Sequence, residues 1–224
     1  MLLRGRGYQD IYKSFRWRIP RQYNIGVDIA DKHPATAPAI LHVLPDGKLE
    51  TISFGYLRAQ SNRLANALTA KGLRRGDRVG VLLGQRPETA IAHAGIYKAG
   101  LVAVPLFGLF GEEALQYRLA VSGARALITD AAGLAKIAAI RDRLPDLSLV
   151  LCVDGANAGA DGFEDILARA SDAFRAPHTL ADDPAMIIFT SGTTGQPKGA
   201  LHAHRVLLGH LPGVEFPQDF FPEK

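Results

Sequence analysis

Short, continuously apolar segments alternate with amphipathic segments through the middle of the chain, and this alternation most constrains the fold. The apolar segments are residues 79–83, 101–105, 126–129 and 147–153. The amphipathic segments that separate them are residues 87–100, 112–121 and 134–144. Buried strands that are each followed by a helix are typical of parallel sheets with helices on their faces. The sequence therefore predicts an α/β fold with a largely parallel sheet flanked by helices.

A hairpin and a long helix are expected before this alternation. A Pro-Asp-Gly-Lys turn at residues 45–48 separates the runs 39–44 and 49–53, which predicts two antiparallel strands. Ser53 can cap a helix over residues 54–71, because its hydroxyl accepts a hydrogen bond from an amide of the first turn.

Shorter helices are expected elsewhere in the chain. The sequence predicts them over residues 24–33 and 163–170, the second of them after a small glycine-containing loop at residues 155–162.

Composition excludes several classes of protein. The chain has 224 residues, 47% hydrophobic and 21% charged, so neither disorder nor a collagen-like structure is expected. Its net charge of +4 is too mild and too dispersed for a nucleic-acid-binding surface. Cys152 is the single cysteine of the sequence, which excludes an internal disulfide and a cysteine-based zinc cluster. We expect a cytoplasmic protein that binds no nucleic acid.

The longest apolar stretch does not predict a membrane span. It covers residues 89–107 and contains His93, Lys98 and Pro105, whereas a spanning helix needs about 20 predominantly apolar residues. We therefore interpret it as a helix followed by a strand.

The two ends of the chain differ from its middle. Residues 1–23 are expected to form a basic arm, with six Lys or Arg residues and Asp10 as the one acid among the first 21. The arm has no apolar core of a secretory signal, and Ser14 is its one serine, unlike a Ser-rich presequence. Residues 24–224 are expected to form the domain, and because no closing element precedes Lys224, we interpret that domain as truncated.

The segment that carries chemistry is residues 186–204, MIIFTSGTTGQPKGALHAH. Its candidate phosphate-binding residues are Thr190, Ser191, Gly192, Thr193, Thr194, Gly195, Gln196, Pro197 and Lys198. Glycines let backbone amides approach a ligand closely, and hydroxyls and an ammonium group add further anion-binding donors. The sequence therefore predicts a phosphate-binding hairpin loop near the C-terminal end, between an apolar run and a second short strand.

The spacing within this loop excludes two common nucleotide-binding motifs. A Walker A loop places Ser or Thr directly after its lysine, but Gly199 follows Lys198 here and Pro197 precedes it. A dinucleotide fingerprint also fails, because the glycines are spaced three and four residues apart. A P-loop phosphohydrolase therefore stays a less favoured alternative, and a Ser/Thr/Gly-rich hairpin without a ligand is the other one.

The loop and three other segments resemble one known family. Residues 189–199, FTSGTTGQPKG, look like the signature loop of the adenylate-forming, or AMP-binding, superfamily, which includes acyl-CoA synthetases. Residues 97–106, YKAGLVAVPL, are similar to its upstream motif. Residues 51–57 and 75–79 resemble its helix-opening and strand-entry motifs, and the resemblance extends over residues 24–224.

The resemblance implies a fold and a two-step reaction. The implied fold is the N-terminal part of the large domain of an adenylate-forming enzyme. A carboxylate attacks the α-phosphate of ATP, giving an acyl-adenylate and pyrophosphate, and the thiol of coenzyme A then displaces AMP. Residues 190–198 would hold the β- and γ-phosphates, with Lys198 as the catalytic residue and Mg²⁺ entering with ATP. Residues 106–115 look most like acetyl- or medium-chain acyl-CoA synthetases.

The chain also departs from that family in length. Members are more than twice as long, and their later segments supply contacts to adenine, ribose and magnesium and a C-terminal lid domain with a further lysine. We therefore expect the 224 residues to be inactive alone. A non-catalytic fragment that binds a nucleotide or a partner is the alternative.

A metal site is not expected from the remaining polar clusters. His202 and His204 would share one face of a strand, with His210 six residues later, which is a weak ligand pattern. Asp182 and Asp183 precede a proline, and a turn into the strand is the better interpretation.

Two further pairs of residues, one acidic and one aromatic, are interpreted as structural rather than functional. Glu112 and Glu113 are expected to offset the dipole at the start of a helix rather than to act as an acid–base pair. Phe107 and Phe110 are expected to be core aromatics rather than substrate contacts.

Overall fold

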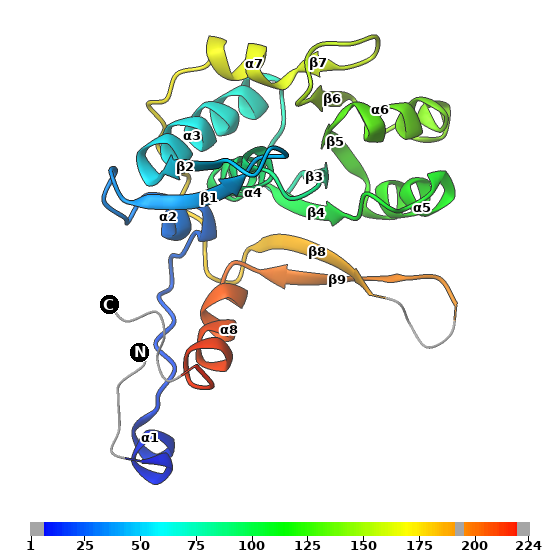
Figure 1. The fold of residues 1–224 in the computed structure, drawn as a ribbon. Coiled ribbons are helices and arrows are strands. Elements are labelled where there is room, and N and C mark those ends of the chain that lie inside the picture. The colour runs from blue at the N-terminus through cyan, green and yellow to red at the C-terminus, as the bar shows by residue number, and fades with distance from the viewer. Residues whose placement is uncertain (1–6, 191–194, 219–224) are drawn as a thin grey trace.

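A computed structural model describes residues 7–190 and 195–218 of the chain. Within these residues the strands form two sheets (Figure 1). The small sheet is a hairpin of β1 (Pro38–Val43) and β2 (Leu49–Ser53), as the sequence predicts. The large sheet has the strand order β7-β6-β5-β3-β4-β8-β9, and its six neighbouring pairs are parallel apart from β8 and β9. The predicted α/β fold with a largely parallel sheet is confirmed.

Most strands of the large sheet coincide closely with the predicted apolar segments. The exception is Asp161–Gly162, which was expected to lie in the loop over residues 155–162 but pairs with Leu151 and Cys152 as a short edge strand. The strands of this sheet are β3 (Arg78–Leu82), β4 (Val102–Leu106), β5 (Ala124–Thr129), β6 (Leu149–Cys152), β7 (Asp161–Gly162), β8 (Pro184–Thr190) and β9 (Lys198–Ala203). The helices are α1 (Tyr8–Ser14), α2 (Ile25–Ala30), α3 (Phe54–Ala70), α4 (Pro87–Lys98), α5 (Glu112–Ser122), α6 (Ala131–Ala138), α7 (Phe163–Arg169) and α8 (Val206–Glu215).

Helices cover both faces of the large sheet, so the chain has two hydrophobic cores (Figure 1). On one face, Leu64 of α3 and Ile96 of α4 pack with side chains from the centre of the sheet. On the other face, Leu119 of α5 and Ile137 of α6 pack against Leu127 of β5. This two-sided burial explains why the central strands are apolar throughout rather than alternating.

Local capping confirms one predicted boundary and corrects another. The Ser53 side chain accepts a hydrogen bond from the Tyr56 amide at 3.2 Å and begins α3, as predicted. The helix predicted over residues 134–144 instead begins at Ala131, because the Asp130 side chain accepts from the Gly133 amide at 2.7 Å. It ends at Ala138, and a short 3₁₀ helix (Arg141–Arg143) follows.

The β8–β9 hairpin extends the sheet and then leaves it. The pairing between β4 and β8 is limited, within the described residues, to Ala103 and Met186. The two antiparallel strands continue past that point and run beneath α5 (Figure 1). None of the helices in the described ranges is both long and apolar enough to cross a membrane.

Candidate functional site

The predicted phosphate loop lies at the tip of the β8–β9 hairpin. Thr190 ends β8 and is paired with Lys198, which begins β9. Gly195, Gln196 and Pro197 lie in the turn that leads into β9, and Gly195 has a φ of 90°, a conformation that favours glycine. The other four candidate residues, Ser191, Gly192, Thr193 and Thr194, lie outside the described residues.

The described donors of the loop face solvent. Thr190 and Lys198 are both exposed, and the Thr190 hydroxyl lies 3.5 Å from the Lys198 carbonyl oxygen. Lys198 forms no ion pair with any residue that the structure describes. Among the described residues, the Lys198 ammonium group is thus available to bind an anion, and the Thr190 hydroxyl lies beside it on the adjacent strand.

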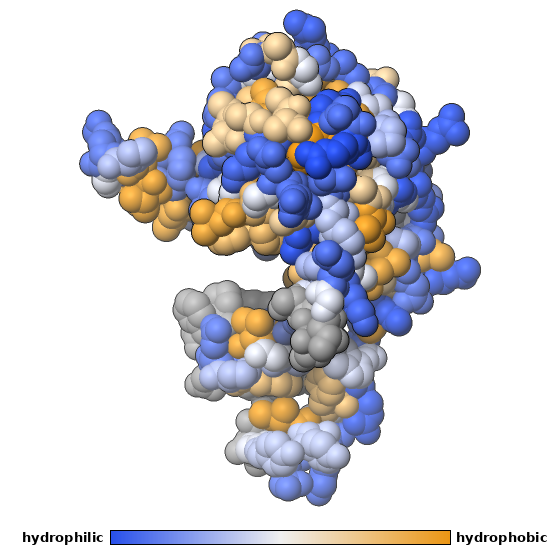
Figure 2. All heavy atoms as spheres, turned by 90° about the vertical axis from the view of Figure 1, so that its right-hand side faces the viewer, coloured by the Kyte–Doolittle hydropathy of each residue, from blue (hydrophilic) through white to orange (hydrophobic). Residues whose placement is uncertain are grey.

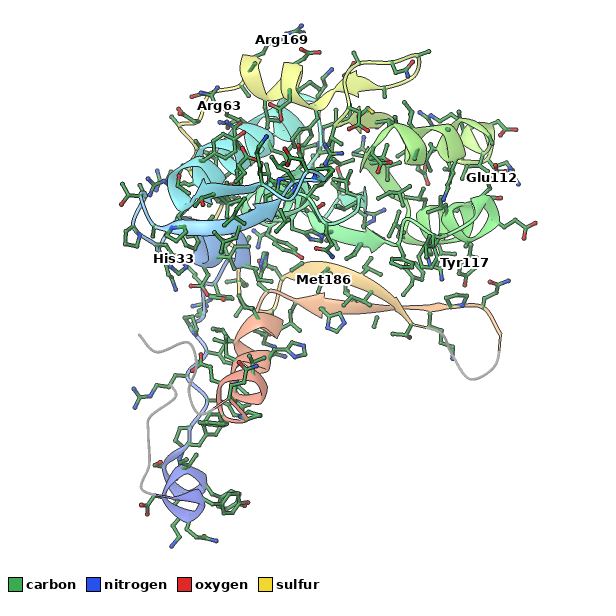
Figure 3. The ribbon with its side chains drawn as sticks, in the orientation of Figure 1. His33, Arg63, Glu112, Tyr117, Arg169 and Met186 are labelled. Atoms are coloured by element: carbon green, nitrogen blue, oxygen red, sulfur yellow. The ribbon has the colours of Figure 1, made fainter. Side chains whose placement is uncertain are left out.

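Helix α5 contacts both strands next to this tip. The Tyr117 hydroxyl donates a hydrogen bond to the Pro197 carbonyl oxygen at 3.1 Å. The Tyr117 ring also packs edge-to-face on Phe189, with 6.4 Å between the ring centroids. Figure 3 shows Tyr117 on the side of α5 that faces the hairpin. The tip of the hairpin is therefore contacted by helix α5, and not by its own two strands alone.

Arg118 follows Tyr117 and is buried between two aromatic rings. Its guanidinium carbon lies 4.0 Å from the Phe110 ring centroid and 5.7 Å from that of Phe189. One nitrogen donates to the Ala114 carbonyl oxygen at 2.9 Å, but Nε has no partner among the described residues. The buried cation is thus contacted by two aromatic rings and by one backbone carbonyl oxygen.

The segment before α5 shows one correct and one wrong prediction. Phe110 packs against the core, as expected. Phe107 is instead 61% exposed, because the chain leaves the sheet after β4, although its ring makes an edge-to-face contact with Phe110. Figure 2, which looks at this side of the molecule, shows hydrophobic patches interspersed with hydrophilic ones.

A surface cavity of about 530 Å³ opens at the start of α5. Its lining includes Glu112 and Glu113, which lie in the first helical turn, where carboxylates offset the helix dipole as predicted. Lys136 of α6 lines the same cavity and donates to the carbonyl oxygens of Gly108 and Phe110 at 2.7 and 3.1 Å.

His204 has a structural role. β9 ends at Ala203, so His202 and His204 do not share a strand face as expected; His204 turns inward and is fully buried. Its Nδ1 accepts a hydrogen bond from the Ile25 amide at 3.2 Å. Burial lowers the pKa of His204 to about 4, so the ring is neutral at neutral pH.

A second buried network lies beside His204. The Tyr97 hydroxyl donates to the Met186 sulfur at 3.4 Å and lies 3.1 Å from Nδ1 of His93. Burial lowers the pKa of His93 to about 4 and raises the pKa of Tyr97. Within the described ranges, no three His, Cys, Asp or Glu side chains are placed to hold a metal ion.

The turn before β8 is confirmed. The Asp183 carboxylate accepts a hydrogen bond from the Leu180 amide and pairs with Arg75. Asp182 pairs with Arg205 at 2.9 Å across the base of the hairpin.

Tyr117 and Arg118 are the residues near the loop that sequence reasoning missed. The Tyr117 contact joins residues 80 positions apart, which no local pattern records. A signal existed for Arg118, because it occupies the buried face of α5 together with Leu115, Leu119 and Ser122. A charged residue in such a stripe indicates a buried guanidinium.

Comparison with known proteins decides the family. The sequence model of the family described as AMP-binding enzyme matches residues 28–221, which is most of the chain. The chain belongs to the AMP-binding enzyme family. It is 29% identical over 210 residues to an acetyl-coenzyme A synthetase of Xanthobacter autotrophicus, covering 84% of the chain and 32% of that protein. It is 33% identical over 198 residues to a human mitochondrial acyl-coenzyme A synthetase, and the match covers 84% of this chain and 34% of that protein.

Solved structures of this family share the fold. The anthranilate CoA ligase AuaEII in complex with anthranoyl-AMP superposes with a TM-score of 0.78 at 30% identity, over 88% of this chain and 38% of that one. An acyl-CoA synthetase of Brucella canis superposes with a TM-score of 0.79 at 27% identity, over 87% of this chain and 36% of that one. The chain thus spans about a third of the length of its curated relatives.

Proposed function

We propose that this chain forms part of an ATP-dependent, AMP-forming acyl-CoA synthetase and carries its triphosphate-binding loop. The observation that carries the proposal is the hairpin tip, where Thr190 and Lys198 are exposed side by side and Lys198 has no ion-pair partner among the described residues. The family match supports the use of ATP, and relatives named acetyl- and acyl-coenzyme A synthetases support a carboxylate and coenzyme A as the other substrates.

The proposed loop acts on the leaving group of the first step. A carboxylate oxygen bonds to the α-phosphorus of ATP, and the bond from that phosphorus to the bridging oxygen breaks. Pyrophosphate leaves with the electron pair, so negative charge increases at its bridging oxygen. The Lys198 ammonium, the Thr190 hydroxyl and loop amides lower the energy of that charge, because they are placed before the reaction starts.

The second step uses the adenylate. The thiol of coenzyme A attacks the acyl carbon, the bond to the AMP oxygen breaks, and a thioester and AMP result. Mg²⁺ would enter bound to the ATP phosphates, whose charge it neutralises. We assign the acetyl- or medium-chain branch and a cytoplasmic location, the latter because Cys152 is a free, buried thiol.

Titration calorimetry of the 224-residue chain tests whether the loop binds the triphosphate. We expect MgATP and inorganic pyrophosphate to bind and to compete with each other. AMP should not compete, because it lacks the two phosphates that the loop would contact. Lys198→Ala should weaken pyrophosphate binding by about two- to fivefold, as loss of one exposed charge contact predicts.

Lys48→Ala is the matched control, since Lys48 is an exposed lysine in the turn of the other hairpin and should not affect binding. Absence of pyrophosphate binding, or AMP competing as well as MgATP, would refute the proposal. Binding of ATP followed by hydrolysis without any carboxylate would favour the P-loop phosphohydrolase alternative instead.

A further inference from the structure

The tip of the β8–β9 hairpin needs support that the sheet does not give. Within the described residues β8 is paired with β4 at Met186 alone, four residues before Thr190. From Ile187 onward, the described part of the chain pairs β8 with β9 alone, up to the pair formed by Thr190 and Lys198. A two-stranded ribbon is marginally stable by itself, so the position of the loop depends on packing against another element.

Tyr117 of α5 supplies a contact to each strand of this ribbon. Its ring packs on Phe189, the residue directly before Thr190. Its hydroxyl donates to the carbonyl oxygen of Pro197, the residue directly before Lys198. One half-buried side chain therefore contacts the two residues that precede the exposed donors of the loop.

The residues around Phe189 fit this contact. Gly199 is paired with Phe189 across the hairpin, and a Cβ at Gly199 would lie 2.9 Å from Ile187 Cγ2 and 3.5 Å from the Phe189 ring. Glycine at this position lets the Phe189 ring pack closely over β9. The buried Arg118 side chain, 9% exposed, lies over the same ring and over Phe110. Phe189 is thus contacted from β9 and from α5.

We infer that Tyr117 is a positioning residue for the phosphate loop, with its ring fixing the β8 strand and its hydroxyl fixing the β9 strand. The inference rests on the proposed function, since it concerns how the same loop binds phosphate. Tyr117 does not contact the ligand. By contacting both strands it keeps Thr190 and Lys198 in their paired arrangement, so that these two donors are in place before phosphate binds.

Two variants separate the contributions of the hydroxyl and the ring. Tyr117→Phe keeps the ring contact with Phe189 and removes the hydrogen bond to Pro197. We expect it to weaken binding of inorganic pyrophosphate about two- to tenfold, the effect of one lost hydrogen bond. Tyr117→Ala removes both contacts and should weaken binding further. Tyr12→Phe, on an exposed tyrosine of α1, is the control that should leave binding unchanged.

Amide resonances of the unliganded chain give a second readout, which general destabilisation would not mimic. In Tyr117→Phe, the ¹⁵N–¹H signals of Gln196, Lys198 and Gly199 should shift, whereas those of β5 and β6 should not. Wild-type pyrophosphate affinity together with unshifted loop signals in Tyr117→Phe would overturn the inference, whether or not Tyr117→Ala folds. If the wild-type chain binds no pyrophosphate, the proposed function fails, and the resonance shifts alone then decide whether Tyr117 fixes the loop.

Discussion

At the scale of single residues, Lys98 shows how a side chain in a family-like motif can have a structural role. It is completely buried, and its ammonium group lies 2.6 Å from an Asp31 oxygen and 2.8 Å from the Asn62 side-chain oxygen. Burial lowers the pKa of Lys98, and the hydrogen bond to Asp31 opposes that shift. The Lys98 side chain therefore joins α4 to Asn62 of α3 and to Asp31, the residue that follows α2. Removing Asp31 alone would leave a buried charge unpaired.

The buried ring of His204 predicts a loss of stability in mild acid. Its pKa is about 4 in the folded chain and about 6.5 when exposed, so the unfolded chain binds more protons between these values. Stability is therefore complete above about pH 6.5 and is lost as the pH falls towards 4. The loss from this ring is on the order of 3 kcal/mol, at about 1.4 kcal/mol per pKa unit.

Urea unfolding at a series of pH values measures this loss. His204→Gln should be less stable at pH 7 and should lose less further stability between pH 6.5 and 4 than the wild type does. His178→Gln, at an exposed histidine, should keep the wild-type dependence. Identical pH slopes for His204→Gln and the wild type would show that this ring does not titrate on unfolding.

At the scale of elements, the contact between α2 and α4 depends on the absence of a side chain at Gly26. A Cβ at Gly26 would lie 2.4 Å from the Ala94 carbonyl oxygen and 2.8 Å from Cγ of Lys98. Because one of these atoms is backbone, the two helices would have to separate. We expect Gly26→Ala to lower the free energy of unfolding by about 1–3 kcal/mol, as measured from urea midpoints.

Gly209 in α8 is the matched control for Gly26→Ala. A Cβ there meets none of the described residues within 4 Å, so Gly209→Ala should raise helix stability by about 0.5–1 kcal/mol. Equal effects of the two substitutions would mean that α2 does not pack against α4 as closely as described.

The elements differ in how well the sequence predicted them. The central strands of the large sheet were predicted closely, because burial on both faces leaves continuous apolar runs. The two-residue edge strand β7 was expected to be loop, since it has no apolar run. The start of α6 was missed by three residues, since Asp130 was not read as a cap although it precedes two alanines with good helix propensity. The position of Phe107 was wrong because hydrophobicity alone does not show where a chain leaves the sheet.

At the scale of the whole molecule, the two cores are complete around the central strands but not around the β8–β9 hairpin. Leu201 on β9 is 61% exposed, and α8 buries none of its residues. Residue types and their order predict the chemistry of the loop, and that stays a prediction. The contact between Tyr117 and the hairpin could not be predicted in this way, because it depends on packing between residues 80 positions apart. The order of the strands likewise follows from packing, which residue patterns do not record.

The central claim, that Lys198 acts on departing pyrophosphate, is tested most directly by carboxylate-dependent ATP–pyrophosphate exchange. Because the proposal makes this chain part of a longer acyl-CoA synthetase, the exchange is measured on that longer protein, with Lys198 or with Lys198→Ala. We expect the exchange rate to fall about 100- to 1,000-fold, the effect of losing one preorganised transition-state contact. The KM for ATP should change only a few-fold. An unchanged exchange rate in Lys198→Ala would contradict the account.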